Sequence, residues 1–328
     1  MTEARKHGLG GLWRRRELNV VYALVALSVL IYLRNANFGT LFNVQVILRQ
    51  VAIFGLLALA EMLVIITAGI DLSVGSMVAF VGVVEALLVA KLGWSLPLAL
   101  LVGLTASVLI GMYHGVAVSK WGIPPFIITL GSLSIWRGLA TGVTKSYPVL
   151  IAHEGFRWIG QGMLWIVPVP VAILIVVALL LAYLLNRTSL GRNIYAVGGN
   201  IEAARLSGIP VTRVLIVTYT LASFIVGIAG TIVAGRMAQG LPSVASGYEL
   251  NSIAATIIGG TSFFGGIGTV QGTLLGALLM AAIDNSLILM GVSAYWYTLV
   301  VGTIILLAVT IDVVSTNRRR RAEELMGI

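Results

Sequence analysis

The chain has 328 residues, of which 59% are hydrophobic and only 10% are charged, and its mean hydropathy is +1.02. Soluble globular domains carry about 25% charged residues, so this composition excludes that class and indicates a polytopic α-helical membrane protein. The net charge of +9 does not indicate nucleic acid, because the basic residues cluster at the chain ends and in a central polar segment.

Ten apolar segments follow one another along the chain, most of them about as long as the roughly 20 residues that cross a bilayer. They lie at about residues 18–33, 46–68, 72–90, 95–118, 125–143, 166–185, 212–235, 249–265, 268–290 and 295–312. No small-residue cleavage site precedes the first polar loop, so we expect a retained first helix and no removed signal peptide. The predicted fold is all-α, with one transmembrane domain over residues 18–312.

The basic residues orient this domain. With a cytoplasmic N-terminus, the inside regions are residues 1–17, 119–124, 186–211 and 313–328. Together with Arg213 they hold 14 of the 21 Lys and Arg residues. Because Lys and Arg favour cytoplasmic loops, we expect both basic termini in the cytoplasm and an even number of spans.

Two glycine- and hydroxyl-rich breaks interrupt the apolar segments, at residues 68–76 and 259–268. Such backbone is tolerated at membrane depth only where it is buried in protein or lines a wet cavity. The breaks occupy comparable places in the two halves of the chain, which indicates an internal repeat of about five spans per half. Alternatively, the glycines only permit close helix packing.

Seven ionisable residues fall within or beside the spans: Glu61, Asp71, Glu85, Arg137, Glu249, Asp284 and Asp312. An uncompensated charge at the bilayer centre costs at least about 2.5–3.5 kcal/mol, so each needs a partner, water or an interfacial position. Asp71 either caps the following helix or lines a path, and we expect His114 at the interface. No His or carboxylate set has metal-ligand spacing, so the sequence predicts no metal and no cofactor.

Catalytic motifs are absent from the sequence. It contains no G-x-x-x-x-G-K-[ST] phosphate loop, no G-x-S-x-G elbow and no H-E-x-x-H helix. We therefore expect a transport protein and not an enzyme. A secondary transporter is an alternative, and it would need the acidic residues to couple transport to ions or protons. A membrane enzyme would need a convergent catalytic set.

The central polar segment, residues 191–210, is flanked by strongly apolar segments and so cannot lie in hydrocarbon. Asn200 is a plausible N-cap, and Glu202 falls in the first turn that would follow. Gly208 and Pro210 supply a stop after four good helix formers. The segment predicts one short helix outside the bilayer.

Four stretches carry a family resemblance: Gly-Ile-Asp-Leu-Ser-Val-Gly-Ser at 69–76, Ile-Pro-Pro-Phe-Ile-Ile-Thr-Leu-Gly at 123–131, residues 191–208, and Ile-Gly-Gly-Thr-Ser at 258–262 continuing to Gly265 and Gly266. With these stretches the chain resembles the permease subunit of bacterial ABC importers for simple sugars, of the ribose, xylose, arabinose and galactose type. The autoinducer-2 permeases belong to the same group. Glu202, Ala203, Ala204 and Gly208 fit the E-A-A-x-x-x-G core with which importer permeases contact their ATPase, although the later Leu-Pro of the extended motif is missing.

The resemblance implies a ten-helix subunit of the inner membrane, paired with a second permease copy that is identical or closely related. Its expected partners are cytoplasmic ATPase subunits and a periplasmic sugar-binding protein, and the solute is a pentose or hexose. Autoinducer-2 or another small polar solute is the alternative. The residues expected to contact the ATPase are Asn200, Glu202, Ala203, Ala204, Arg205, Leu206 and Gly208. The candidates for lining the path are Asp71, Ser73, Asn251, Thr261 and Ser262.

Overall fold

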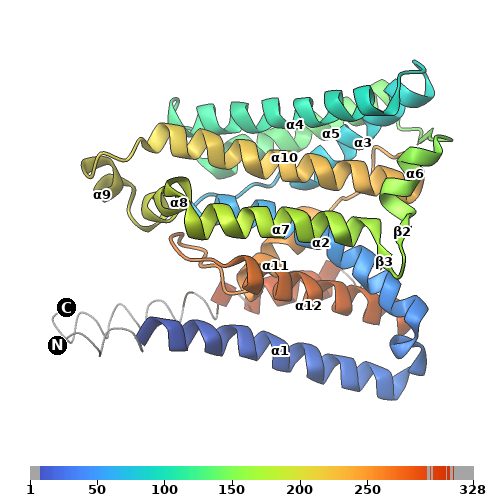
Figure 1. Ribbon diagram of the computed structural model, residues 1–328, viewed down its shortest axis with the longest axis horizontal. Coiled ribbons are helices and arrows are strands. Elements are labelled where there is room, and N and C mark those ends of the chain that lie inside the picture. The colour runs from blue at the N-terminus through green and yellow to red at the C-terminus, as the bar shows by residue number, and fades with distance from the viewer. Residues whose placement is uncertain (1–7, 294–295, 297, 308, 311–312, 314–328) are drawn as a thin grey trace.

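The computed structural model describes residues 8–293, 296, 298–307, 309–310 and 313. Its elements in chain order are α1 (Gly8–Arg34), η1 (Ala36–Gly39), α2 (Leu41–Ile66), α3 (Val74–Ala90), α4 (Leu96–Ser119), α5 (Pro125–Thr144), β1 (Val149–Leu150), α6 (Glu154–Gln161), β2 (Met163–Leu164), β3 (Val167–Pro168), α7 (Val169–Arg187), α8 (Ser189–Gly199), α9 (Ile201–Leu206), α10 (Val211–Met237), β4 (Gln239–Gly240), α11 (Tyr248–Ile258) and α12 (Val270–Leu289). The long helices lie side by side, and α8 and α9 extend from one end of the bundle (Figure 1).

Among the described residues, six helices are long and apolar enough to cross a membrane, namely α2, α4, α5, α7, α10 and α12. Shorter apolar helices cover Leu18–Arg34, Val74–Ala90 and Thr298–Leu307. This order confirms a polytopic helical membrane protein. The predicted segment 295–312 and the basic tails at 1–17 and 313–328 lie partly outside the described residues.

Several predicted boundaries are wrong, for local reasons. The helix α1 begins at Gly8 and not near residue 18, so it continues through the basic stretch. The helix α2 begins five residues earlier than predicted, because the Thr40 hydroxyl accepts a hydrogen bond from the Asn43 N–H at 3.3 Å and caps it. The helix α11 stops at Ile258 and not at 265, because the chain turns at Gly260 with a φ of +94°.

The core is built around α2 and α10. Residues 51–66 of α2 are all buried, and α2 packs against α7, α10, α11 and α12. The helix α10 packs in turn against α3, α4 and α6. Each of these two helices therefore makes many of its contacts with the other half of the chain, which interlocks the halves.

Three connections between these helices matter below. The first break, residues 67–73, joins α2 to α3, and the second break, residues 259–269, joins α11 to α12. The α10–α11 loop, residues 238–247, lies between them in sequence. Both α2 and α10 are followed by an alanine in the left-handed conformation, Ala68 with a φ of 59° and Ala238 with a φ of 53°.

Short strands, which the sequence did not predict, lie in the connections. Antiparallel pairing joins β1 to β4, with Val149 opposite Gly240, and joins β2 to β3 in a hairpin. The hairpin and α6 lie at the end of the bundle opposite α8 and α9 (Figure 1). The fold remains dominated by helices.

Candidate transport path and coupling segment

The first break is held by the Asp71 side chain. Asp71 is 1% exposed, and its Oδ1 accepts hydrogen bonds from the Ser73 N–H at 2.8 Å and the Ser73 hydroxyl at 2.6 Å. These bonds fix the turn that leads into α3. Of the two roles open for Asp71, the geometry supports helix initiation, and both residues are buried in the single chain.

A second carboxyl group lies close to the first. The Glu61 Oε1 on α2 accepts the Asp71 backbone N–H at 3.1 Å, and Glu61 is fully buried. Its Oε2 has no hydrogen-bond partner within the part of the chain that the structure describes. Two carboxyl groups therefore share one buried site between α2 and the first break.

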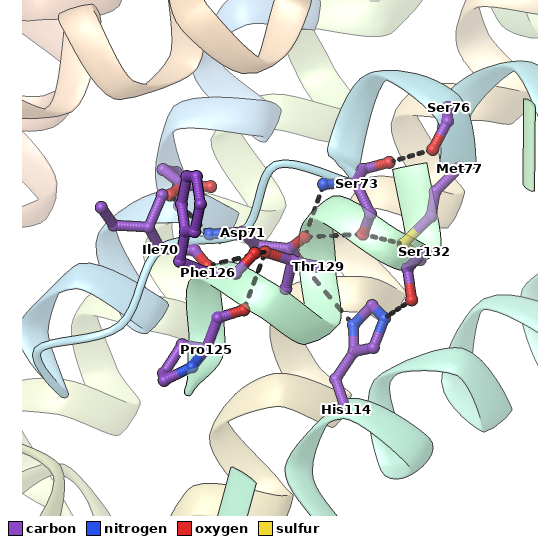
Figure 2. A network of polar contacts seen from close by, with 11 residues as sticks. Ile70, Asp71, Ser73, Ser76, Met77, His114, Pro125, Phe126, Thr129 and Ser132 are labelled. Atoms are coloured by element: carbon purple, nitrogen blue, oxygen red, sulfur yellow. Dashed lines mark hydrogen bonds and ion pairs between the residues drawn. The ribbon is translucent and has the colours of Figure 1, made fainter. Parts of the chain in front are cut away.

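His114 joins the same cluster and is buried inside the protein. It is 0% exposed, with Nδ1 at 3.8 Å from the Asp71 Oδ2 and Nε2 at 2.7 Å from the Ser132 hydroxyl (Figure 2). The sequence carried one sign of this burial, namely the glycines Gly111 and Gly115 on either side of His114. A Cβ at either position would overlap the backbone of α10, so glycine lets α4 approach closely and buries His114.

The helix α5 tethers two of the connections. The Thr129 hydroxyl shares its proton between the carbonyl of Pro125 in its own helix, at 2.9 Å, and the carbonyl of Ile70 in the first break, at 3.1 Å (Figure 2). About two turns further along the same helix, the Arg137 guanidinium donates to the carbonyls of Pro242 and Val244 in the α10–α11 loop, both at 2.7 Å. These two carbonyls give the guanidinium the hydrogen-bond partners that the sequence alone could not identify.

The first turns of α3 and α11 lie against each other. A Cβ on Gly75 would overlap both the carbonyl oxygen of Ala245 and the Oε2 of Glu249. This contact brings the start of α3, which follows Asp71 and Ser73, next to the start of α11, which carries Asn251. Asn251 is 2% exposed.

The second break is held mainly by its backbone. The Ser262 N–H donates to the carbonyl of Ile267 at 3.0 Å, and the Phe264 N–H donates to the Ser262 hydroxyl at 3.3 Å. Thr261 is 0% exposed and Ser262 is 5% exposed. These two candidates lie at the end of α11 opposite Asn251, so the five predicted path residues form two groups.

The central polar segment contains two helices, α8 and α9, and not the predicted one. Residues 189–199 are helical because the Thr188 hydroxyl accepts from the Gly191 N–H at 3.1 Å and caps α8. The predicted N-cap is confirmed, since the Asn200 Oδ1 accepts the Ala203 N–H at 2.9 Å. The predicted stop is also confirmed, with α9 ending at Leu206 before Gly208, whose φ is +79°.

The helix α9 has one buried position and a free outer face. Ala204 is 4% exposed and faces the protein, whereas Leu206 is 89% exposed. Glu202 and Arg205 form an exposed ion pair at 2.8 Å, which contributes little to stability at such a position. The outer face of α9, with Leu206 and this ion pair, is therefore uncovered in the single chain.

A basic pocket of about 660 Å³ lies between the end of α4 and the start of α10. Its cations are Lys120, Arg205 and Arg213. No group of three or more His, Asp or Glu side chains suited to a metal occurs among the described residues.

The chain matches known proteins over most of its length. A family model described as "Branched-chain amino acid transport system / permease component" matches residues 43–309. The xylose transport system permease protein XylH of Escherichia coli (strain K12) is 35% identical over 378 aligned positions, which cover 95% of this chain and 96% of that protein. The ribose import permease protein RbsC of Escherichia coli (strain K12) is 39% identical, covering 92% and 94%.

A third relative is the L-arabinose ABC transporter permease protein AraH of Azospirillum brasilense. It is 35% identical, covering 95% of this chain and 92% of that protein. No solved structure matches the chain.

Proposed function

The chain belongs to the family of branched-chain amino acid transport system permease components, and from that premise we propose that it is the permease subunit of an ABC importer that carries a simple sugar. The similarity to xylose, ribose and arabinose permeases over most of the chain supports this solute class. The chain is a transport subunit, and ATP hydrolysis belongs to a partner.

The observation that carries the proposal is the helix α9. Importer permeases need a compact cytoplasmic element through which an ATPase moves the transmembrane helices. The helix α9 is capped at Asn200, ends before Gly208, exposes Leu206 and extends from one end of the bundle (Figure 1). We assign it, with Glu202, Ala203, Arg205 and Leu206, as the contact with a cytoplasmic ATPase, whereas the buried Ala204 packs α9 onto its own chain.

The proposed topology has ten spans with both termini in the cytoplasm of a bacterial cell, and a periplasmic sugar-binding protein at the opposite end. It is supported by the charge bias and by the position of α8 and α9 at the same end as the start of α1 (Figure 1). An internal repeat is supported by the two long helices that each precede a left-handed alanine, Ala68 or Ala238, and then a shorter helix.

The proposed complex contains a second permease copy, identical or closely related, and α5 offers a face for it. Only 22% of the apolar window of α5 is buried. A Cβ at Gly131, Gly138 or Gly142 would meet nothing within 4 Å. Small residues on an exposed membrane helix allow close approach of another helix.

The proposed mechanism is alternating access without chemistry on the solute. Closure of the ATPases displaces α9, and the transmembrane helices shift between inward- and outward-facing arrangements. Between the two copies the solute passes the polar breaks, with Asp71, Ser73, Asn251, Thr261 and Ser262 as the candidate lining. All five are buried in the single chain, so this role requires that the helices around them separate during the cycle.

Charge reversal on α9 tests the ATPase contact. We expect Glu202→Lys to lower the amount of copurified ATPase about five-fold or more, because like charges that meet across an interface cost several kcal/mol. Glu154→Lys is the matched control, since Glu154 is exposed and lies on α6 at the opposite end of the bundle. Gly208→Asp places a side chain at a left-handed position and should also lower the amount of copurified ATPase. Unchanged assembly and uptake in both Glu202→Lys and Gly208→Asp would refute the assignment.

An ion-coupled secondary transporter is the second candidate, and the cluster of Glu61, Asp71 and His114 favours it. Buried ionisable groups within spans often form proton relays. This candidate predicts uptake that a protonophore abolishes while ATP is held constant.

A further inference from the structure

The end of α8 is wedged against the end of α2. Gly198 is buried, and a Cβ at this position would overlap the carbonyl oxygen of Ile66, the last residue of α2. The contact is therefore one of backbone against backbone. Because no side chain with free rotamers stands between them, a displacement of one segment moves the other.

The second break also contacts the end of α2 at Ile66. The Gly266 N–H donates to the Ile66 carbonyl at 2.8 Å. A Cβ at Gly265 would lie 2.7 Å from the carbonyl oxygen of Gly198 and 3.0 Å from the Cβ of Ala68. The end of α8, the start of the first break and the tip of the second break thus meet at one junction, which we name the glycine junction (Gly198, Ile66, Ala68, Gly265 and Gly266).

Tyr195 adds a side-chain bond from α8 to the second break. Its hydroxyl donates to the carbonyl of Gly268 at 2.8 Å. Tyr195 precedes Gly198 by three residues, so both lie on one face of α8. The helix is attached to the second break at two points, and one of those points also contacts α2.

We propose that Gly198 and Tyr195 are the positioning residues that pass the movement of α9 to both breaks at once. This inference rests on the proposed function, in which an ATPase contacts α9. Asn200 alone separates α8 from α9, and its side chain caps α9, so the two helices move together. The breaks are the least regular parts of the spans, and a push at the glycine junction reaches both of them.

Two neighbouring glycines give a matched test in proteoliposomes that contain the copurified ATPase and binding protein. Gly198→Ala inserts a methyl group into the junction, whereas a Cβ at Gly199 would meet nothing within 4 Å. We expect Gly198→Ala to lower the solute transported per ATP hydrolysed about five-fold or more, the size of a typical coupling between two sites. Gly199→Ala should leave this ratio unchanged.

Because Gly198→Ala can impair folding, Tyr195→Phe provides the gentler variant. It removes one hydrogen bond and leaves the ring in place, so the ratio should fall about two- to ten-fold. Tyr183→Phe, at an exposed position of α7, is its control. Copurified ATPase should match the wild type in Tyr195→Phe, and its thermal unfolding should show a folded protein that loses no more than the single hydrogen bond.

An unchanged transport-to-hydrolysis ratio in Tyr195→Phe and in folded Gly198→Ala would overturn the proposal. Transport and hydrolysis that fall in parallel would overturn it too, because the contacts would then serve assembly and not transmission. Failure of the proposed function gives a different result, since the wild-type chain would then bind no ATPase at all.

Discussion

The two breaks are held by different chemistry. In the first break, side chains make the contacts, with Asp71 receiving two hydrogen bonds from Ser73 and Thr129 reaching the Ile70 carbonyl. In the second break, most of the contacts are between backbones at glycines, with the Ser262 and Tyr195 hydroxyls adding side-chain bonds. A break held by buried polar side chains loses most when a partner is deleted, whereas one held by glycines loses most when a methyl group is added.

Deleting the central acceptor of the first break should have the largest effect. We expect Asp71→Ala to lower the free energy of unfolding by about 3 kcal/mol, because buried polar groups lose their partner. Asp71→Asn keeps a carbonyl oxygen in place and should cost about 1 kcal/mol. Denaturant titration in detergent, followed by tryptophan fluorescence, measures both, and equal losses would show that the hydrogen bonds to Ser73 do not hold the break.

Adding a methyl group beside the second break should cost less. A Cβ at Gly276 on α12 would overlap the carbonyl oxygen of Ala255 on α11. We expect Gly276→Ala to destabilise by about 2 kcal/mol, the usual range for overpacking. The control is Gly302→Ala, because a Cβ there meets nothing within 4 Å. The same titration measures both, and an equal effect of the two variants would argue against backbone packing as the cause.

Removing the tether from α5 to the first break should have a small effect. Thr129→Val deletes the bond to the Ile70 carbonyl and should cost about 0.6 kcal/mol, as for typical hydrogen bonds between membrane helices. The Thr141 hydroxyl bonds only to carbonyls of its own helix among the described residues, so Thr141→Val should cost less. Unfolding of the two variants in one detergent compares their losses in stability. A larger loss in Thr141→Val than in Thr129→Val would exclude the tether.

The smallest expected effect is a pH dependence at Tyr195, which links α8 to the second break. Burial raises the pKa of the Tyr195 phenol above its ordinary value, so the folded state holds the proton more tightly than the unfolded state. Its contribution to stability is complete below about pH 10 and is lost as the pH rises through the folded pKa. The stability difference between wild type and Tyr195→Phe should therefore shrink only above about pH 10, and a difference that grows there would contradict this sign.

Much of the fold could be predicted from the sequence because membrane spans are local. The apolar segments, the Asn200 cap and the stop before Gly208 each depend on a few neighbouring residues. The same local reasoning missed Thr40 and Thr188, whose hydroxyls extend α2 and add α8. A hydroxyl beside a helix is a weak signal among many.

The contacts that organise the candidate site could not be predicted, because they join distant segments. His114 reaches Asp71 across 43 positions only because α4 packs closely on α10. Asn43 and Asn285 exchange hydrogen bonds at 3.0 and 2.8 Å between α2 and α12, which are far apart in sequence. The glycine junction likewise requires three segments whose spacing in the sequence carries no sign of their meeting.

The most direct test of the central claim is uptake of a radiolabelled pentose or hexose by proteoliposomes that hold the chain with its copurified ATPase, its binding protein and internal ATP. The account predicts uptake that requires ATP and the binding protein and that a protonophore leaves unchanged. Uptake that a protonophore abolishes at constant ATP, or that proceeds without the ATPase, would contradict it and would assign the buried carboxyl groups Glu61 and Asp71 to ion coupling.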